Sequence, residues 1–308
     1  MSFIDPSQSI RLDPLPLSIC KQHQITLHLL RLDLIHPLVS GNKWFKLRYN
    51  LQQAKACGAS QVVSFGGAFS NHLHALAWAG KQLGIRTVGV VRGEPEYAQN
   101  PTLSDAAGWG MELKFVSRAE YRQRDDALYH KALLASYPGA VIVPEGGSNA
   151  LAVKGFEDLF EHPCWQHVPN PDLLVSACGT GGTLAGLIAA RPATTNVLGI
   201  PVLKGANFLY ADIQRLLEES GAGPVGGWQL DLDGHEGGYA KLSADLVQFM
   251  RDFYAETNIE LDPVYTGKMM FRLHKLIAQG TFRAGTSIVA VHTGGLQGRR
   301  GFLARGLI

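Results

Sequence analysis

Two lysines with apolar neighbours are the residues of this sequence best suited to chemistry. Lys43 and Lys46 lie three positions apart at the start of a predicted helix, so both side chains project from one face. Trp44, Phe45 and Leu47 flank them, which indicates that the helix is buried on several sides. Burial lowers the pKa of a lysine amine and makes the amine nucleophilic. The alternative is a pair of solvated lysines on an exposed face.

Glycine-rich turns are the second feature, and four of them follow predicted strands. Their sequences are SFGG at 64–67, EGGSN at 145–149, CGTGGT at 178–183 and HTGG at 292–295. Turns of this kind at the carboxyl edge of a parallel sheet are where α/β folds bind ligands. In the third turn, glycines allow backbone amides to point at an anion, a helix begins at once, and Thr180 and Thr183 add hydroxyl donors. This turn therefore predicts a phosphate site, with a merely tight connection as the alternative.

Common phosphate and metal motifs do not account for these residues. No Lys-Ser or Lys-Thr pair completes a P-loop, and no GxGxxG with an acidic partner marks a dinucleotide fold. The four cysteines have no CxxC spacing and the eleven histidines form only one HxH pair, His72 and His74, so no metal site is predicted. A phosphate loop combined with an activated lysine instead suggests pyridoxal 5'-phosphate, which binds lysine covalently.

Composition excludes several other classes of protein. The 308 residues suffice for about two domains, and 46% hydrophobic with 18% charged residues indicates a packed globular core. The 28 basic and 26 acidic side chains give a net charge of +2, so neither nucleic acid nor a membrane is expected as a partner. The uncharged stretches 62–80 and 173–190 contain paired glycines, and we expect a strand, a turn and a helix in each. Reduced cysteines and a start without an apolar signal segment predict a cytoplasmic location.

The predicted elements alternate between strand and helix along most of the chain. This order is typical of right-handed βαβ units and predicts an α/β fold with two open, mainly parallel twisted sheets flanked by helices. The proline-rich segment 162–171 is the expected break between the sheets, and the N-terminal arm is not assigned a place. The predicted strands are 61–65, 87–91, 113–116, 140–143, 173–177, 197–202 and 287–291. The predicted helices are 42–57, 70–83, 103–109, 119–137, 149–160, one that ends at 190, 208–220, 243–256 and 267–279.

Seven motifs, spread over nearly the whole chain, connect these features. They are GNKWFKL at 41–47, GGAFSNH at 66–72, GGSNALAVKGF at 146–156, ACGTGGTLAG at 177–186, GGYAKLS at 237–243, DPVYTGKM at 262–269 and HTGG at 292–295. In this order the chain resembles the tryptophan-synthase-β-like (fold type II) pyridoxal phosphate enzymes. Within them it looks like the family of D-cysteine desulfhydrases and 1-aminocyclopropane-1-carboxylate (ACC) deaminases.

The resemblance has consequences for domain organisation and partners. It implies a large cofactor-binding domain of residues 1–52 plus 158–308, with a small domain of residues 53–157 inserted in it. Pyridoxal phosphate is expected in the cleft between the two sheets. The resemblance also implies a small amino-acid substrate and a homodimer.

The resemblance assigns roles to individual residues. Lys43 matches the lysine that forms the Schiff base and acts as the base, and Lys46 matches a lysine near the cofactor phosphate. Ser70 and Asn71 match a pair that faces the substrate carboxylate and the 3-hydroxyl of the cofactor. The implied catalytic residues are thus Lys43, Ser70 and two tyrosines at the substrate, Tyr239 and Tyr265. The remaining implied cofactor contacts are the phosphate cup of Gly179, Thr180, Gly181, Gly182 and Thr183, and Thr293 beside the pyridine nitrogen.

Five positions depart from the family pattern or vary within the family. Trp44 and Phe45 stand where members mostly carry Thr-Arg, and His72 stands where they carry an amide or a threonine. ACC deaminases typically have a glutamate after DPVY and a leucine before the last Gly-Gly, whereas this chain has Thr266 and Thr293. A hydroxyl beside the pyridine nitrogen leaves the ring neutral, which suffices for β-elimination because the leaving group takes the electrons. These residues favour a pyridoxal phosphate-dependent lyase that converts D-cysteine, or a similar β-substituted amino acid, to pyruvate, ammonia and sulfide.

Three alternatives stay open. The first is an ACC deaminase. The second is an L-amino-acid lyase that eliminates a sulfonate, which a basic pocket residue such as Lys154 or Lys268 would favour. The third is a non-catalytic pyridoxal phosphate-binding protein, against which the intact Lys43, Ser70 and Tyr265 argue.

Overall fold

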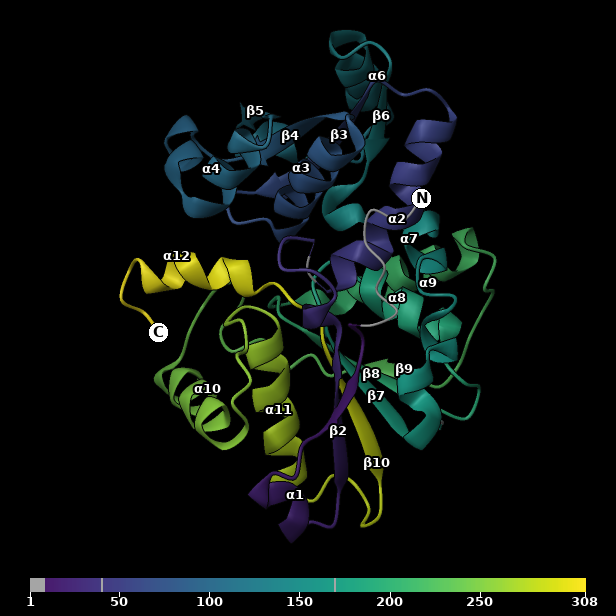
Figure 1. Cartoon of the computed structure of the whole chain (residues 1–308), viewed down its shortest axis with the longest axis vertical. Coiled ribbons are helices and arrows are strands. Elements are labelled where there is room, and N and C mark those ends of the chain that lie inside the picture. The colour runs from purple at the N-terminus through teal and green to yellow at the C-terminus, as the bar shows by residue number, and fades with distance from the viewer. Residues whose placement is uncertain (1–8, 40, 169) are drawn as a thin grey trace.

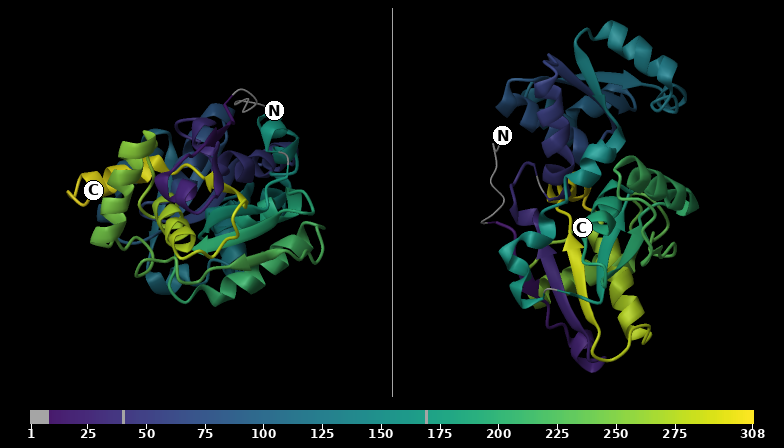
Figure 2. Two further views of the ribbon diagram at one scale, coloured as in Figure 1. Left: turned by 90° about the horizontal axis from the view of Figure 1, so that it is seen from below. Right: turned by 90° about the vertical axis from the view of Figure 1, so that its right-hand side faces the viewer.

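The computed structural model describes residues 9–39, 41–168 and 170–308, and it contains two sheets in two lobes. Figure 1 shows the smaller lobe above the larger, with α2, α7 and α8 at their junction, and Figure 2 shows the same division from the side. Each sheet has helices packed against it. The predicted α/β class with two mainly parallel sheets is confirmed.

The smaller sheet is entirely parallel and has the strand order β5-β4-β3-β6. Its central strand β3 is a continuous buried run, as expected for a parallel strand covered on both faces. The strands are β3 (Gln61–Gly67), β4 (Arg86–Arg92), β5 (Met111–Val116) and β6 (Ala140–Val143). The helices of this lobe are α3 (Asn71–Leu83), α4 (Pro101–Gly108), α5 (Arg118–Tyr121) and α6 (Ala127–Ser136).

The larger sheet has the order β1-β2-β10-β7-β8-β9, and only β1 runs antiparallel to its neighbour. Its strands are β1 (Leu12–Pro14), β2 (Thr26–Arg31), β7 (Leu173–Cys178), β8 (Asn196–Pro201), β9 (Trp228–Leu230) and β10 (Ser287–His292). Its helices are α1 (Ser18–Gln22), α2 (Asn42–Ala56), α7 (Ala150–Lys154), α8 (Gly182–Ala190), α9 (Leu209–Glu219), α10 (Ala244–Thr257), α11 (Thr266–Ala278) and α12 (Arg299–Leu303). The N-terminal arm, which sequence reasoning did not place, thus supplies β2, which pairs with β10, and β1, which pairs with β2 at the edge of the sheet.

Two predicted helices are wrong. The expected helix 119–137 is broken into α5 and α6, because Asp126 takes an extended backbone and its carboxylate accepts hydrogen bonds from the amides of Leu128 and Tyr129. The expected helix 149–160 is limited to α7 and a later short 3-10 helix, Leu159–Glu161. The chain leaves the helix after Gly155, and the Phe156 ring then stacks on that of Phe45 with centroids 4.7 Å apart.

The uncharged stretches of the sequence do not form long helices. Residues 62–80 contain β3 and the first part of α3, and residues 173–190 contain β7 and α8, as predicted. Within the described ranges, no helix is both long and apolar enough to cross a membrane. The domain boundaries after residues 52 and 157 stay a prediction.

The contact between α7 and α2 is closed by Gly155. A Cβ atom at this position would lie 2.0 Å from the backbone oxygen of Phe45, so any larger residue forces the two helices apart. Because α2 carries Lys43 and Lys46, this contact also fixes the position of both lysines relative to α7.

Replacing Gly155 with alanine is expected to lower the free energy of unfolding by about 1–3 kcal/mol, because the added methyl group overpacks the junction. The matched control is Gly108→Ala in α4, where a Cβ atom meets nothing within 4 Å. This control is expected to stabilise the protein by about 0.5–1 kcal/mol, since alanine restricts the unfolded chain more than glycine does. Urea denaturation checks both, and an unchanged midpoint for Gly155→Ala would contradict the packing argument.

Candidate active site

The four glycine-rich turns meet where the carboxyl ends of the two sheets face each other. A Cβ atom at Gly146 would lie 2.8 Å from Oγ1 of Thr180, which joins the second turn to the third. A Cβ atom at Gly147 would lie 2.9 Å from Cε1 of His72, just after the first turn. In these two glycines φ is also positive, at 65° and 67°, so glycine is required on both grounds. Segments far apart in the sequence are thereby brought to one site.

Hydroxyl groups surround the amine of Lys46. Its Nζ donates to Oγ of Ser148 at 2.7 Å and lies 3.5 Å from Oγ1 of Thr180, and these two hydroxyls are 2.6 Å apart. A Cβ atom at Gly182, the first residue of α8, would lie 2.6 Å from Oγ of Ser148 and 3.0 Å from Nζ of Lys46. Nδ2 of Asn42 donates to Oγ1 of Thr183 at 2.8 Å on the same helix end.

This donor set fits a phosphate group. A cation, three hydroxyls and the N-terminus of α8 converge on a place kept free by glycine. The structure brings the predicted residues Lys46 and 179–183 together here. It also adds Ser148 and Asn42, which sequence reasoning missed. The signal for Ser148 was its place in the second glycine turn.

Lys43 begins α2 beside this cup. Its Nζ donates to Oδ1 of Asn42 at 2.8 Å. Burial lowers the pKa of Lys43 to about 8, against an opposing effect from the charge of Asp262. The pKa of Lys46, which is 2% exposed, lies well below its usual value because of burial and the charge of Lys43. The sequence-based expectation of desolvated amines is thus met at both lysines.

Gly41 fixes the start of α2 against the fourth glycine turn. Its φ is 61°, and a Cβ atom there would lie 2.0 Å from the backbone oxygen of Thr293. The amide of Asn42 donates to that same oxygen at 3.2 Å. Thr293, which is 6% exposed, therefore lies next to the base of the helix that carries Lys43.

Ser70 and Asn71 lie together at the N-terminus of α3. Oγ of Ser70 accepts a hydrogen bond from the amide of Leu73 at 3.2 Å and caps the helix. Oδ1 of Asn71 accepts a hydrogen bond from Nε2 of Gln297. A Cβ atom at Gly295 would lie 2.8 Å from Nδ2 of Asn71, so this side chain abuts the fourth turn.

His72 is a buried neutral ring. Oγ of Ser64 donates to the backbone oxygen of Val143 at 2.7 Å, so it accepts the proton of Nε2 of His72 at 2.8 Å. Nδ1 has no protein partner in the part of the chain that the structure describes. Burial, reinforced by the charges of Lys46 and Lys43, holds the pKa of His72 well below its usual value. A neutral ring fits beside two amino groups and an anion site.

Tyr265 and Tyr239 lie opposite the third turn. Their hydroxyls are 3.3 Å apart, and a Cβ atom at Gly179 would lie 3.1 Å from Cε1 of Tyr265. Burial raises the pKa of Tyr265 well above its usual value, so its hydroxyl stays protonated. Tyr239 is 43% exposed and forms the outer wall.

Asp262 holds the first turn of α11 and with it Tyr265. Oδ2 accepts from the amides of Val264 and Tyr265 at 2.9 Å each, and Oδ1 accepts from the amide and the hydroxyl of Thr266 at 2.8 Å each. The amide of Asp262 donates to Oγ1 of Thr266 at 2.8 Å in return. Thr266 is fully buried, so its hydroxyl serves the cap rather than a substrate.

Lys268 anchors the loop that carries Tyr239. Its Nζ donates to the backbone oxygens of His235 at 2.9 Å and Gly238 at 2.5 Å. The loop has positive φ angles at Glu236, Gly238 and other positions, and its backbone is held open around the ammonium group. Lys268 is fully buried, and its amine is bonded to this loop. Lys154 is exposed on α7.

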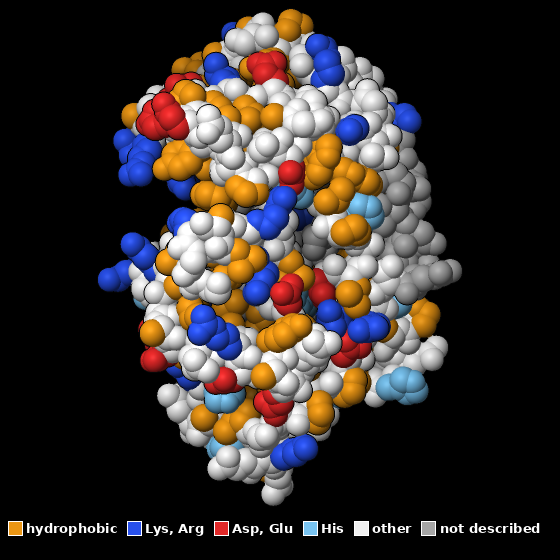
Figure 3. Space-filling view, turned by 60° about the vertical axis from the view of Figure 1, so that its left-hand side comes forward, with side chains coloured by type: hydrophobic (Ala, Val, Ile, Leu, Met, Phe, Trp, Pro, Cys, Tyr) orange, Lys and Arg blue, Asp and Glu red, His pale blue; other side chains and the backbone are white. Residues whose placement is uncertain are grey.

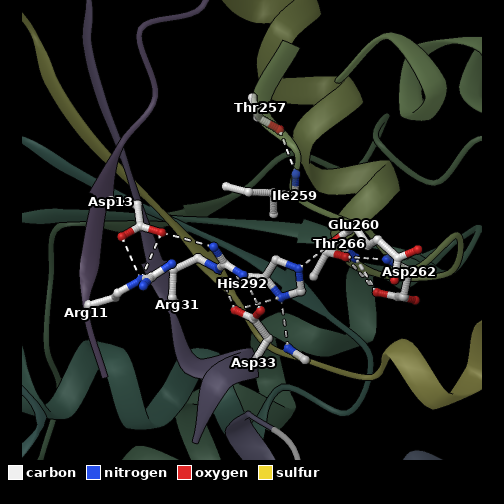
Figure 4. Close-up of polar contacts among 11 residues, drawn as sticks. Arg11, Asp13, Arg31, Asp33, Thr257, Ile259, Glu260, Asp262, Thr266 and His292 are labelled. Carbon is white, nitrogen blue, oxygen red and sulfur yellow. Dashed lines mark hydrogen bonds and ion pairs between the residues drawn. The ribbon is translucent and has the colours of Figure 1, made fainter. Parts of the chain in front are cut away.

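His292 connects the fourth turn with the cap of α11 (Figure 4). Its Nε2 donates to the backbone oxygen of Glu260 at 2.7 Å, and its Nδ1 accepts from the amide of Gly294 at 3.2 Å. Oδ1 of Asp33 lies 3.5 Å from Nδ1, and the two carboxylate oxygens of Asp33 accept hydrogen bonds from Nε and Nη2 of Arg31. His292 is therefore a fully bonded core residue that joins the fourth turn to Glu260, two residues before Asp262.

Comparisons with known proteins agree with this geometry. The family model for pyridoxal-phosphate dependent enzymes matches residues 5–294. A crystal structure described as an ACC deaminase homologue is similar, with a TM-score of 0.84 at 25% sequence identity, and the match covers 97% of this chain and 94% of that one.

Relatives of this chain carry two activities in their names. A Thermotoga maritima protein, provisionally named a 1-aminocyclopropane-1-carboxylate deaminase, is 30% identical over 94% of this chain and 96% of its own. A mitochondrial protein of Arabidopsis thaliana, named a bifunctional D-cysteine desulfhydrase/1-aminocyclopropane-1-carboxylate deaminase, is 28% identical over 84% of this chain and 70% of its own. The D-cysteine desulfhydrase of Serratia proteamaculans is 26% identical, with 87% and 86% covered. The chain therefore belongs to the pyridoxal-phosphate dependent enzymes, in the family of ACC deaminases and D-cysteine desulfhydrases.

Proposed function

We propose that this protein eliminates hydrosulfide from D-cysteine, or a similar β-leaving group from a related amino acid, to give pyruvate and ammonia. The observations that support the proposal are the desolvated amine of Lys43 and the two tyrosine hydroxyls, 3.3 Å apart, beside the third glycine turn. The amine is suited to take a proton, and the tyrosine hydroxyls are the groups in the proposal that supply one to the leaving group.

Cofactor binding follows from the donor set described above. Pyridoxal phosphate, when bound, supplies an electron sink for the charge that develops at the α-carbon. In the proposal, Lys46, Ser148, Thr180 and Thr183 hold its phosphate, and Asn71 and Thr293 contact its ring. Lys43 would hold it covalently.

The remaining steps use side chains of this chain. Ser70 and the free amides at the N-terminus of α3 bind the substrate carboxylate. The freed amine of Lys43 removes the α-proton, the carbon–sulfur bond breaks, and the sulfur leaves with the bonding pair. Tyr265, with Tyr239 beside it, donates a proton to the leaving sulfur. The aminoacrylate that is released hydrolyses to pyruvate and ammonia.

The choice of D-cysteine over ACC is carried by Thr293. A hydroxyl in this place leaves the pyridine nitrogen unprotonated, and opening a cyclopropane without an α-hydrogen needs a stronger electron sink than β-elimination does. Thr266 cannot add to the argument, because its hydroxyl is used in the Asp262 cap. Since relatives carry both names, ACC deaminase stays the second candidate.

A third candidate, a lyase for a sulfonated amino acid, requires a cation near the substrate's β-carbon. Lys154 and Lys268 do not supply it, as their positions show. Arg92 lies at the carboxyl end of β4. Its Nη2 is 3.6 Å from a Cβ position at Gly67, three residues before Ser70. Figure 3 shows basic side chains on both sides of the hollow between the lobes. An anionic substrate therefore belongs in the assay.

A panel of five substrates separates the candidates: D-cysteine, L-cysteine, β-chloro-D-alanine, L-cysteate and ACC. Sulfite and pyruvate from L-cysteate alone would favour the third candidate. We expect pyruvate from D-cysteine and β-chloro-D-alanine and no 2-oxobutyrate from ACC. Pyruvate from L-cysteine alone would reverse the chirality. If 2-oxobutyrate forms from ACC faster than pyruvate forms from any other substrate, ACC deamination replaces the proposal.

Replacing Lys43 with alanine is expected to lower kcat with D-cysteine by at least about a hundredfold, the range for loss of a general base. The visible absorbance of the lysine-bound cofactor should disappear as well. Lys55→Ala, at an exposed position of the same helix, is the control and is expected to change neither reading. Retained turnover and absorbance in Lys43→Ala would remove Lys43 from the proposal.

The pH dependence of Lys43 is set by its lowered pKa. In the cofactor-free protein we expect its amine to lose its proton near pH 8, whereas a solvated lysine has a pKa of about 10.4. The fraction of reactive neutral amine therefore grows as the pH rises through 8. Titration of ¹³C-dimethylated lysines by NMR gives this midpoint, and the Lys43→Ala variant assigns the signal. A midpoint at 10 or above would show that the amine is solvated.

A further inference from the structure

A chain of polar contacts runs from the smaller lobe through the C-terminal segment to Asn71. After β10, the chain forms a short 3-10 helix, Leu296–Gly298, and then α12. Nη2 of Arg300 lies 2.6 Å from Oδ2 of Asp105 in α4 and 3.4 Å from Oε1 of Gln297. Oγ1 of Thr102, also in α4, donates to the same Oε1 at 3.0 Å. Gln297 in turn contacts Asn71.

The hydrogen-bonding chemistry of these groups fixes the orientation of two side-chain amides, those of Gln297 and Asn71. A guanidinium group can only donate hydrogen bonds, so the side-chain oxygen of Gln297, and not its nitrogen, must face Arg300. The nitrogen of Gln297 then faces Asn71 and donates to its Oδ1. The NH2 group of Asn71 is consequently turned to the other side. The orientation of one amide is thus passed on to the next.

The other side of Asn71 faces the fourth glycine turn. Its Nδ2 lies 2.8 Å from the Cβ position of Gly295, in the turn that continues from Thr293. Asn71 also follows Ser70 at the N-terminus of α3. The two sides of its amide therefore face different partners: the oxygen faces Gln297 in the protein, and the nitrogen faces the glycine turn.

We propose that Gln297 is a positioning residue that presents the NH2 group of Asn71 as a hydrogen-bond donor to the phenolic oxygen of the cofactor. The inference rests on the proposed function, because it assumes that pyridoxal phosphate binds in this cleft. A donor next to that oxygen stabilises its negatively charged form. A flipped amide would present a second acceptor instead and would repel it. Gln297 itself does not touch the cofactor.

The test is the isosteric substitution Gln297→Glu. A carboxylate has the same shape and keeps a partner in Arg300, but it accepts hydrogen bonds only and cannot donate to Oδ1 of Asn71. A residue with a purely structural role would tolerate this change. If Gln297 sets the polarity of Asn71, the change should invert that polarity while the fold stays intact.

Three readings follow from holoenzyme and cofactor-free protein. We expect Gln297→Glu to weaken pyridoxal phosphate binding, measured by fluorescence titration, by about tenfold, the loss of roughly one hydrogen bond. The visible band of the lysine-bound cofactor should titrate at higher pH, because its negative form loses a donor. kcat with β-chloro-D-alanine should fall more than KM changes.

Two controls complete the experiment. Gln52→Glu, at an exposed position of α2, adds the same charge elsewhere and is expected to change no reading. Gln297→Leu removes both polar atoms and should weaken binding less than Gln297→Glu, since no acceptor is placed against Asn71. Equal affinity and an unshifted band in Gln297→Glu would overturn the inference. Wild-type protein that binds the cofactor but forms no pyruvate would instead overturn the proposed function, and these two readings would still stand.

Discussion

Two lysine amines are buried one helical turn apart, and no carboxylate of the described residues pairs with them directly; the rest of the site depends on this constraint. Nζ of Lys46 meets hydroxyl groups, and Nζ of Lys43 meets the amide oxygen of Asn42. Burying an ammonium group without an anion is unfavourable, which is why the pKa values of both lysines fall. An anion that enters the cup supplies the missing countercharge. Binding of a phosphate therefore relieves a cost that the fold has already incurred.

Close backbone approach is what holds the lysines in this position. At Gly41 the chain passes so near to Thr293 that no side chain fits, and at Gly155 the same holds against Phe45. One contact ties α2 to the end of β10 and the other ties it to α7, so both ends of the lysine pair are fixed by main-chain atoms. Neither contact depends on side-chain rotamers, which makes the spacing between Lys43 and the glycine turns rigid.

Local patterns predicted the parts of this protein that are local in sequence. The alternation of strands and helices, the lysine pair and the glycine turns each lie within a few residues, and the structure contains all of them. Contacts between distant segments were not readable in the same way. Ser148 joins the cup because its turn folds against Thr180, and Thr266 leaves the substrate argument because Asp262 uses its hydroxyl. The broken helix at Asp126 was missed because the polar residues 122–126 are also compatible with the exposed face of one long helix, whereas Asp126 caps a new helix.

The position of Asp262 bears on which group acts as the base. Its charge is felt at Lys43 and raises the pKa of that amine, but its two oxygens already accept four hydrogen bonds from the first turn of α11. Both oxygens of Asp262 are thus engaged in capping this helix. His72 is a neutral ring whose protonated form two nearby amines disfavour. In the proposed function, proton removal at the α-carbon is therefore assigned to the amine of Lys43, whose pKa burial lowers to about 8, rather than to Asp262 or His72.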